Sequence, residues 1–419
     1  MRVLAAIVAP PHLSVSGAAR AAERLSVELA RTCEIAVASM MPDTTWDRAV
    51  AHMPVQSWLP ADFGLARLPN KYRTPFYRSD IADLILPGEF DLVHIHNPMP
   101  AMEMHRIARA CRHAGTPYVV STHGFQEVDA GRTIYRFGPA RRFLWDALVY
   151  RPVARATAAA EGVLLLSEED RRVVRRMGFA GASVFVVPNG VEPRPCLAPA
   201  TVATVLHRFG IEEHGPGQIT CMFLANHTPN KGLTVLFEAF ASLDIPFLLV
   251  VGGERRSGID YEGFSESLGE GQRVIFTGHL LDIEVAALMR RSDLFVFPSL
   301  ADTLPLVVQE ALAARLPVVA SAIGGIPRQI DRSCGILVPP GDAAALAEAV
   351  RRLAADPRML RAMTGAAERR GRALPDWGEC AELALAAYSA VLLSRRSPRR
   401  MFGTKVPGSA SEPAIEEVP

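Results

Sequence analysis

Short, almost wholly apolar segments alternate with amphipathic segments along most of the chain. Apolar runs rich in Val, Ile and Leu, bounded by Gly, Pro and polar residues, indicate strands buried on both faces, which belong to parallel sheets covered by helices. The first amphipathic segment, 18–32, predicts such a helix. The apolar runs fall at 3–9, 34–40, 91–96, 118–122, 162–167 and 184–188, and then at 219–225, 246–252, 273–278, 293–299, 317–321 and 335–342.

The alternation divides the chain into two parts of similar size. It pauses at 188–200, a segment without periodicity that has three prolines between 193 and 199, as a linker does. We therefore predict an α/β fold with two Rossmann-like, doubly wound domains, 1–192 and 193–372, that face an interdomain cleft. Ligands of open parallel sheets bind at the carboxyl ends of the strands, so we expect the functional site in that cleft. Residues 395–419 are polar, proline-rich and without pattern, which predicts a disordered tail.

Composition narrows the class of protein. The net charge of +1 gives no case for a nucleic-acid partner. Six cysteines without C-x-x-C pairs argue against a zinc site or a disulfide framework and fit a reducing, cytoplasmic environment. The short apolar run at the N-terminus predicts a buried strand and not a signal peptide. No apolar run approaches the roughly 18 residues needed to span a bilayer, so we expect membrane contact to be peripheral at most.

The segment 298–321, PSLADTLPLVVQEALAARLPVVAS, contains only two acids, Asp302 and Glu310, near the start of a helical pattern. Pro305 fits a first helical turn, where free backbone N–H groups attract anions. An eight-residue separation places both acids on one helix face, where carboxylates can accept hydrogen bonds from vicinal hydroxyls. The pattern indicates a sugar-nucleotide site; the alternative is an N-cap and a solvated acid. The N–H groups expected to contact the nucleotide sugar are those of Thr303, Leu304 and Leu306.

Continued through Gly324–Gly325 and 335–338, this segment resembles the donor-binding region of retaining, GT-B-fold glycosyltransferases of family 4. That family typically has an E-x7-E motif, here Asp302 and Glu310, before a small-Pro-Val-Val stretch, a Gly-Gly pair and a Gly-x-Leu-Val segment. The resemblance covers roughly residues 1–393 and implies a GT-B fold whose terminal helix, 373–394, crosses back to the first domain. Further matching segments are 121–125, 164–179, 187–192, 229–243 and Trp377.

The resemblance also implies roles for individual residues. Lys231 would neutralise the leaving diphosphate, Glu310 would hold the ribose and Asp302 the donor sugar. His123 would lie under the sugar ring. Taken without the resemblance, Lys231 at a strand-to-helix turn suits a phosphate as a point charge, and the alternative is a surface lysine. A lone histidine such as His123 is more often structural.

The chain departs from the family pattern at two positions of the expected donor site. Asn226 stands where the family usually has an arginine, so one positive charge is missing unless His227 or an arginine from elsewhere replaces it. Ser16–Gly17 stands where the family has a Gly-Gly pair approaching the donor phosphate, which leaves Gly17 as the expected contact. A dinucleotide-binding G-x-G-x-x-G is not present in that turn.

Two other patterns leave alternatives open. His94 and His96 alternate on a strand and so share a face; they could be a metal pair, but no third ligand is evident nearby, and cleft lining is the other interpretation, with His96 on the acceptor side. Residues 132–155 hold six arginines, five aromatics and one acid, Asp146. That stretch predicts either contact with an anionic membrane surface or a solvated helix that packs its aromatics inward.

Together these features predict a retaining hexosyltransferase. It would move a hexosyl unit from a nucleotide-diphosphate sugar to a glycan or lipid-linked acceptor, in cell-surface polysaccharide synthesis at the cytoplasmic face of the membrane. No bound metal or other cofactor is expected. Two alternatives are a GT-B sugar-nucleotide 2-epimerase, which needs no acceptor, and a non-catalytic nucleotide-sugar binder, which the missing arginine would favour.

Overall fold

The structure, a computed structural model, describes residues 1–419 apart from six segments. The predicted tail, 395–419, lies outside the described residues from 397 onward, as does Ser16, whereas Arg395 and Arg396 belong to the last helix and not to a tail. The segments left out are 10–16, 42–49, 61–72, 193–196, 212–216 and 397–419.

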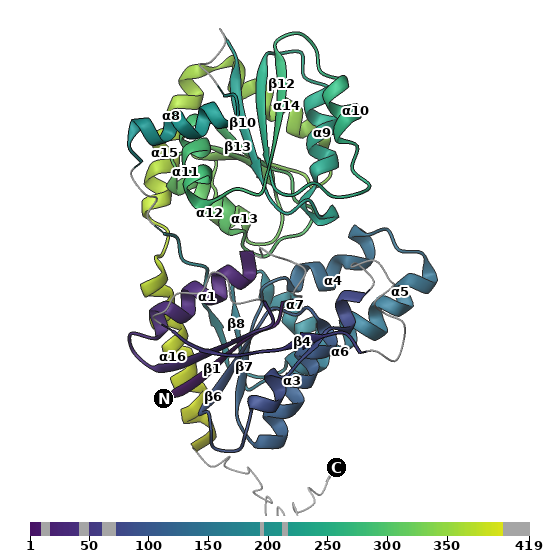
Figure 1. Cartoon of the computed structure of the whole chain (residues 1–419), viewed down its shortest axis with the longest axis vertical. Coiled ribbons are helices and arrows are strands. Elements are labelled where there is room, and N and C mark those ends of the chain that lie inside the picture. Colours follow the sequence, from purple (N-terminus) through teal and green to yellow (C-terminus); the bar gives the residue numbers. More distant parts are fainter. Residues whose placement is uncertain (10–16, 42–49, 61–72, 193–196, 212–216, 397–419) are drawn as a thin grey trace, which may run out of the picture.

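Two parallel sheets organise two stacked domains, which confirms the predicted α/β architecture (Figure 1). The first sheet runs in the order β3 (Ala51–Met53), β2 (Glu34–Ser39), β1 (Arg2–Ile7), β6 (Leu92–His96), β7 (Tyr118–Ser121), β8 (Gly162–Leu165), β9 (Val184–Val186). The second runs in the order β12 (Gln272–Gly278), β11 (Phe247–Gly252), β10 (Ile219–Leu224), β13 (Leu294–Phe297), β14 (Val318–Ser321), β15 (Gly335–Val338). In both sheets the order reverses beside the first strand, which creates the switch point where ligands bind.

Helices cover both sheets, as the amphipathic segments predict. The first domain has α1 (Gly17–Leu29), α3 (Ala101–Ala114), α4 (Phe125–Ile134), α5 (Pro139–Trp145), α6 (Arg151–Ala158) and α7 (Asp170–Arg176), with a π-helical turn (Asp146–Tyr150) joining α5 to α6. The second has α8 (Pro199–Arg208), α9 (Leu233–Ala241), α10 (Tyr261–Glu266), α11 (Asp282–Arg291), α12 (Leu306–Ala313), α13 (Ile326–Gln329), α14 (Ala343–Ala355) and α15 (Pro357–Arg372). A small antiparallel ribbon, β4 (Ser57–Trp58) with β5 (Arg78–Ser79), stands beside the first sheet.

The first sheet is buried on both faces, and its strands send alternate residues to two separate cores. In β1, Leu4 and Ala6 join the core under α3 and α6, whereas Val3, Ala5 and Ile7 join the core under α1. A strand that must satisfy two apolar cores cannot alternate apolar with polar residues. This is why the strands are continuous apolar runs in the sequence.

The last helix of the described chain, α16 (Trp377–Arg396), belongs to the second of these cores. It descends from the second domain along α1 (Figure 1) and buries Cys380, Tyr388 and Val391 against the first sheet. The Tyr388 hydroxyl lies 2.6 Å from Nδ1 of His94, and both side chains are fully buried. The C-terminal helix therefore completes the first domain.

Two chain segments run side by side between the domains. Val191 forms a parallel bridge with Asp376, and its N–H donates to the Pro375 carbonyl. A side chain at Gly190 would overlap the backbone of Trp377, so only glycine allows the two crossings to lie this close. Relative motion of the domains must bend both crossings together.

Within the described part of the chain, no helix combines the length and apolarity that crossing a bilayer requires.

Removing the Tyr388 hydroxyl tests how α16 is fixed. Tyr388→Phe leaves a ring nitrogen of His94 buried without a partner, so we expect the free energy of unfolding to fall by about 1–3 kcal/mol in urea titrations. Leu393→Ala is the control, because Leu393 on the same helix is 63% exposed. That variant should stay within about 0.5 kcal/mol of wild type. Equal stability of Tyr388→Phe and wild type would contradict this role of the buried pair.

Candidate active site

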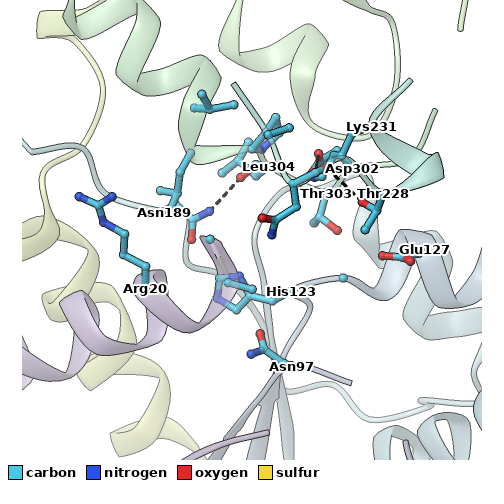
Figure 2. A pocket seen from close by; sticks show the side chains of 18 of the residues that line it. Arg20, Asn97, His123, Glu127, Asn189, Thr228, Lys231, Asp302, Thr303 and Leu304 are labelled. Carbon is cyan, nitrogen blue, oxygen red and sulfur yellow. Dashed lines mark hydrogen bonds and ion pairs between the residues drawn. The ribbon is translucent and has the colours of Figure 1, made fainter. Parts of the chain in front are cut away.

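A cavity of about 680 Å³ lies between the domains, at the carboxyl ends of both sheets. Its walls come from segments that follow β1, β6 and β7 of the first domain and β10, β11, β12 and β13 of the second. Figure 2 shows side chains from both domains converging on this space. All of the residues singled out for the donor site line it: Gly17, His123, Asn226, Lys231, Asp302, Thr303, Leu304, Leu306 and Glu310.

Lys231 and Asp302 form an ion pair on the second-domain wall, with Nζ 2.5 Å from Oδ2 and both side chains largely buried (Figure 2). Lys231 comes from the turn before α9, and Asp302 from the loop after β13. Gly232 allows the two to meet, because its φ of 71° is left-handed and an added Cβ would overlap the Pro298 carbonyl. Asn230 fixes the same loop through its carbonyl, which accepts from Leu300 N–H at 2.7 Å.

Lys231 is also unusual in this composition. The chain has 45 lysines and arginines together, of which only Lys71, Lys231 and Lys405 are lysine. Lysine is a compact cation with a flexible stem, whereas arginine is a rigid planar fork. The chain uses arginine almost everywhere else, so a lysine at this place in the cleft is consistent with a need for a flexible point charge. Such a charge can turn from one anion to another.

The residues from Thr303 to Leu306 line the cleft. Three of their carbonyls are occupied: Thr303 accepts from Gly325 N–H at 2.6 Å, Leu304 from Asn189 Nδ2 at 2.9 Å, and Pro305 from Gln329 Nε2 at 2.9 Å. Within the described residues, no acceptor is found for the N–H groups of Thr303, Leu304 and Leu306. Together with the start of α12, these groups form a site for an anion.

The helix argument for the two acids is wrong in one respect. We expected Asp302 and Glu310 to share a helix face, but α12 begins at Leu306, with Pro305 as its N-cap. Asp302 therefore lies in the preceding loop, and its loop brings it to the cleft that Glu310 lines from the helix. The two acids do line one cavity, as we expected. However, one comes from a loop and the other from a helix, so they do not share a helix face.

His227 does not replace the missing arginine at Asn226. It is buried, with Nδ1 2.8 Å from the Tyr261 hydroxyl and Nε2 3.2 Å from the Gly252 carbonyl, and burial lowers its pKa. The ring is therefore a neutral part of the second-domain core. Asn226 itself lines the cleft, but its side chain carries no charge.

Arg20, on α1, supplies a cation to the cleft that the sequence did not single out. Its guanidinium forms a 2.7 Å ion pair with Asp282 at the start of α11, across the domain boundary. Burial lowers the pKa of Arg20, but the carboxylates of Glu310 and Asp282 raise it by more. The only sequence signal was its place one turn after Gly17, in the first helix after a strand.

His123 is buried and neutral. Burial lowers the pKa of its imidazole to about 4. Asp170 holds the loop that carries His123. Its carboxylate accepts hydrogen bonds from Thr122 Oγ1 at 2.7 Å and from Gln126 Nε2 at 3.0 Å. Burial raises the pKa of Asp170 to about 6 despite these bonds. Gly124 lets the chain turn into α4 with a φ of 75°.

His94 and His96 do share a face, with ring centroids 3.7 Å apart, but neither lines the cleft as we expected of His96. Both are fully buried, and both nitrogens of His94 have partners, Tyr388 and Ser121. The next residue, Asn97, reaches the cleft instead. In the described residues, no cluster of three or more His, Cys, Asp or Glu side chains is arranged to hold a metal ion.

Comparison with known proteins places this geometry in context. Residues 15–194 match the family model described as Glycosyltransferase Family 4, and residues 218–356 match that described as Glycosyl transferases group 1. The 2-deoxystreptamine glucosyltransferase of Streptomyces kanamyceticus is 30% identical over 320 residues, which cover 74% of this chain and 79% of that enzyme.

Solved structures agree on the fold. Sucrose-phosphate synthase from Thermosynechococcus elongatus superposes with a TM-score of 0.72 at 19% identity, covering 94% of this chain and all of that one. Anabaena HepE in complex with UDP-glucose gives a TM-score of 0.68 at 17% identity, covering 94% and 99%. At such identities the likeness shows a shared GT-B fold.

The buried His123 predicts a specific pH dependence of stability. Its folded pKa of about 4 lies below the value of about 6.5 in an unfolded chain, so between these values the unfolded state binds more protons. His123 therefore reduces stability as the pH falls through this interval. His123→Gln should weaken the pH dependence by about one proton, or roughly 1.4 kcal/mol per pH unit near pH 5. Urea titrations at several pH values give the free energy of unfolding as a function of pH. Equal slopes of this function for variant and wild type between about pH 4 and 6 would contradict the prediction.

Proposed function

This chain belongs to glycosyltransferase family 4, and we propose that it transfers a hexosyl unit from a nucleotide-diphosphate sugar to an acceptor hydroxyl with retention at the anomeric carbon. The acceptor is a glycan or a lipid-linked acceptor, and the reaction serves cell-surface polysaccharide synthesis at the cytoplasmic face of the membrane. HepE, which has the same fold, has been crystallised with UDP-glucose, which supports a nucleotide sugar as donor.

The observation that carries this proposal is the second-domain wall of the cleft. It combines a lysine, three free N–H groups and two carboxylates within one cavity. In the proposed complex, the N–H groups of Thr303 and Leu304 and the ammonium of Lys231 bind the diphosphate. Glu310 accepts the ribose hydroxyls, and Asp302 accepts a hydroxyl of the donor sugar.

The reaction is mainly a matter of electrostatic stabilisation. The bond between the anomeric carbon and the phosphate oxygen breaks, and its electron pair leaves with the nucleoside diphosphate. The acceptor oxygen bonds to the same face of the sugar and gives its proton to the departing phosphate. Lys231 and the start of α12 stabilise the charge that develops on the leaving group. The reaction uses no bound metal, and closure of the domains about the paired crossings excludes water.

As Lys231 already contacts Asp302, donor binding must redistribute charge. The diphosphate replaces Asp302 as a hydrogen-bond partner of the Lys231 ammonium. Asp302 is then able to accept a hydrogen bond from a sugar hydroxyl. One ion pair thus prepares two contacts, and neither charge is left unpaired in the empty cleft. The Asp at this position is one methylene shorter than the usual Glu, and its loop position, close to Lys231, is consistent with the shorter reach.

Variants of the two charged residues test the site. Glu310→Ala and Lys231→Ala should each lower transfer more than about tenfold, since each removes a charge-assisted contact worth at least about 1.5 kcal/mol. Arg351→Ala and Glu348→Ala are matched controls, because that pair lies on the outer face of α14 in the same domain. Transfer by both site variants within about twofold of wild type would refute the assignment.

A thermal-shift panel of nucleotide sugars, followed by product analysis, separates this proposal from its alternatives. A donor at about a hundred times its dissociation constant should add roughly 2.7 kcal/mol of stability. Slow release of free sugar without acceptor supports a transferase. Formation of an epimer would indicate a 2-epimerase, and binding without turnover even with acceptor extract would indicate a binder.

Contact with the membrane is a further part of the proposal, and α5 supports it. Phe143 and Leu144 are 65% and 52% exposed, beside the exposed Arg141 and Arg142. Most of the other aromatics of 132–155 face inward: Tyr135, Phe137 and Trp145 form one ring cluster. Apolar tips flanked by arginines suit an anionic lipid surface.

Liposome co-sedimentation tests this contact. The double variant Phe143→Ser/Leu144→Ser should lose most binding to phosphatidylglycerol vesicles, and added salt should weaken wild-type binding. Leu86→Ser, an equally exposed apolar residue elsewhere on the first domain, should bind as wild type does. Retention of full vesicle binding by the double variant would exclude α5 as the contact.

A further inference from the structure

Glu127 lines the cleft from the first domain and has no part in the donor site described above. It lies in the first turn of α4, four residues after His123. Figure 2 shows its carboxylate on the first-domain side, across from Thr228 and Lys231. The charges of Lys231 and Asp302 both act on it. The cleft thus has an acid on the wall that faces the proposed donor site.

The carboxylate is held in one orientation. The Tyr135 hydroxyl, at the far end of α4, donates a hydrogen bond to Glu127. Tyr135 is fixed in turn by its ring contacts with Phe137 and Trp145, at centroid distances of 5.4 and 5.7 Å. Burial raises the pKa of Glu127, and the Tyr135 bond opposes that shift. Burying the charged carboxylate at this position therefore costs free energy. A ligand that donates a hydrogen bond to the carboxylate would offset part of that cost.

Glu127 has acceptor capacity to spare. A carboxylate can accept about four hydrogen bonds, and within the described residues Glu127 accepts one, from Tyr135. It forms no ion pair with Lys231 there, because Lys231 is paired with Asp302. A neutral hydrogen-bond donor, such as a hydroxyl group, is the chemical complement of this vacant capacity.

The same wall has an unpaired acceptor in Asn97. Its side chain is 5% exposed and lines the cleft, and its Oδ1 has no hydrogen-bond partner within the described residues. The residue also has a φ of 69°, which is left-handed and uncommon outside glycine. A buried amide oxygen without a protein partner can accept a hydrogen bond from a ligand or from water that enters the cleft.

Trp145 adds an aromatic surface to this wall. Its Nε1 donates to the Val128 carbonyl at 3.1 Å, and part of its side chain lines the cleft. The ring packs directly against Gly131 of α4, where an added Cβ would overlap it. An aromatic ring beside two hydroxyl acceptors matches a polyhydroxylated ring, with hydroxyls at its edge and C–H groups on its faces.

Glu127 disfavours a phosphate in its own part of the first-domain wall. The carboxylate of Glu127 would repel a phosphate brought against it, whereas an uncharged polyol is attracted. The part of the first-domain wall around Glu127 thus suits a neutral polyol, whereas the loop around Lys231 on the second domain suits an anion.

We propose that Glu127 binds the acceptor substrate and accepts a hydrogen bond from a hydroxyl next to the one that attacks the donor sugar, while Asn97 and Trp145 hold the acceptor's sugar or cyclitol ring. Tyr135 is a positioning residue that aims the carboxylate. This inference rests on the proposed function, because it requires a donor sugar on the opposite wall.

The test measures donor and acceptor separately. The donor is the radiolabelled form of the nucleotide sugar that stabilises the protein in the thermal-shift panel, which begins with UDP-glucose. The acceptor is a total lipid and glycan extract of the source cells, titrated by mass. The variants are Glu127→Ala, Glu127→Gln and Tyr135→Phe. Asp129→Asn is the matched control, since Asp129 on the same helix is ion-paired with Arg176 instead.

Glu127→Ala should raise the extract concentration for half-maximal transfer by about 10- to 100-fold, with Glu127→Gln affected less. Tyr135→Phe should raise it by a smaller factor. Donor binding and donor hydrolysis should stay within about twofold of wild type in every variant, and Asp129→Asn should match wild type throughout. Circular dichroism and the donor-induced thermal shift identify any variant that fails to fold, in which case the remaining two decide.

Each other outcome overturns a definite statement. Transfer by Glu127→Ala and Glu127→Gln with an unchanged extract requirement would remove Glu127 from the acceptor site and leave the proposed function intact. Loss of donor binding in folded Glu127 variants would assign the residue to the donor instead. Wild-type protein that binds no nucleotide sugar, or transfers no label to the extract, would overturn the proposed function and this inference with it.

Discussion

The loop between β13 and α12 is held through its carbonyl oxygens, and the rest of the cleft depends on this constraint. Three consecutive carbonyls, of Thr303, Leu304 and Pro305, accept hydrogen bonds from donors outside the loop. The N–H groups of Thr303, Leu304 and Leu306 have no acceptor among the described residues, and these residues line the cavity. Since the donors belong to the buried Asn189 and Gln329, the loop is fixed before any ligand arrives. An anion bound there would need little reorganisation of the protein.

The backbone segments around this loop pack so closely that certain positions have room only for glycine. Gly324, with a φ of 48°, lies so near the Asp302 carbonyl that an added Cβ would overlap it. Gly232 stands in the same relation to Pro298 on the other side of the loop. The Gly-Gly and Lys-Gly pairs of the sequence therefore have a steric role, which is to let two neighbouring turns clamp the loop that carries Asp302.

Charge is distributed so that the empty cleft contains few unpaired ions. The buried histidines are neutral, because burial lowers the pKa of His123 to about 4 and that of His94 to about 3. Lys231 is paired with Asp302, and Arg20 with Asp282 across the domain boundary. The Arg20 pair is partly exposed, so it contributes little to stability and is screened by salt. A weak interdomain link of this kind is compatible with opening and closing of the cleft.

The sequence by itself determined the two α/β domains, because continuous apolar strands and amphipathic helices are local periodicities that survive in any packing. It also identified most of the second-domain wall, since Lys231, Asp302 and Glu310 belong to short motifs whose turns are set by neighbouring Gly and Pro residues. Tertiary structure alone decided which residues from distant segments meet. It turned His227 into the core, buried His94 against Tyr388 of α16 with His96 beside it, and brought Arg20 and Glu127 into the cleft. Their positions depend on how two sheets and a returning helix pack together, and no local spacing encodes that arrangement.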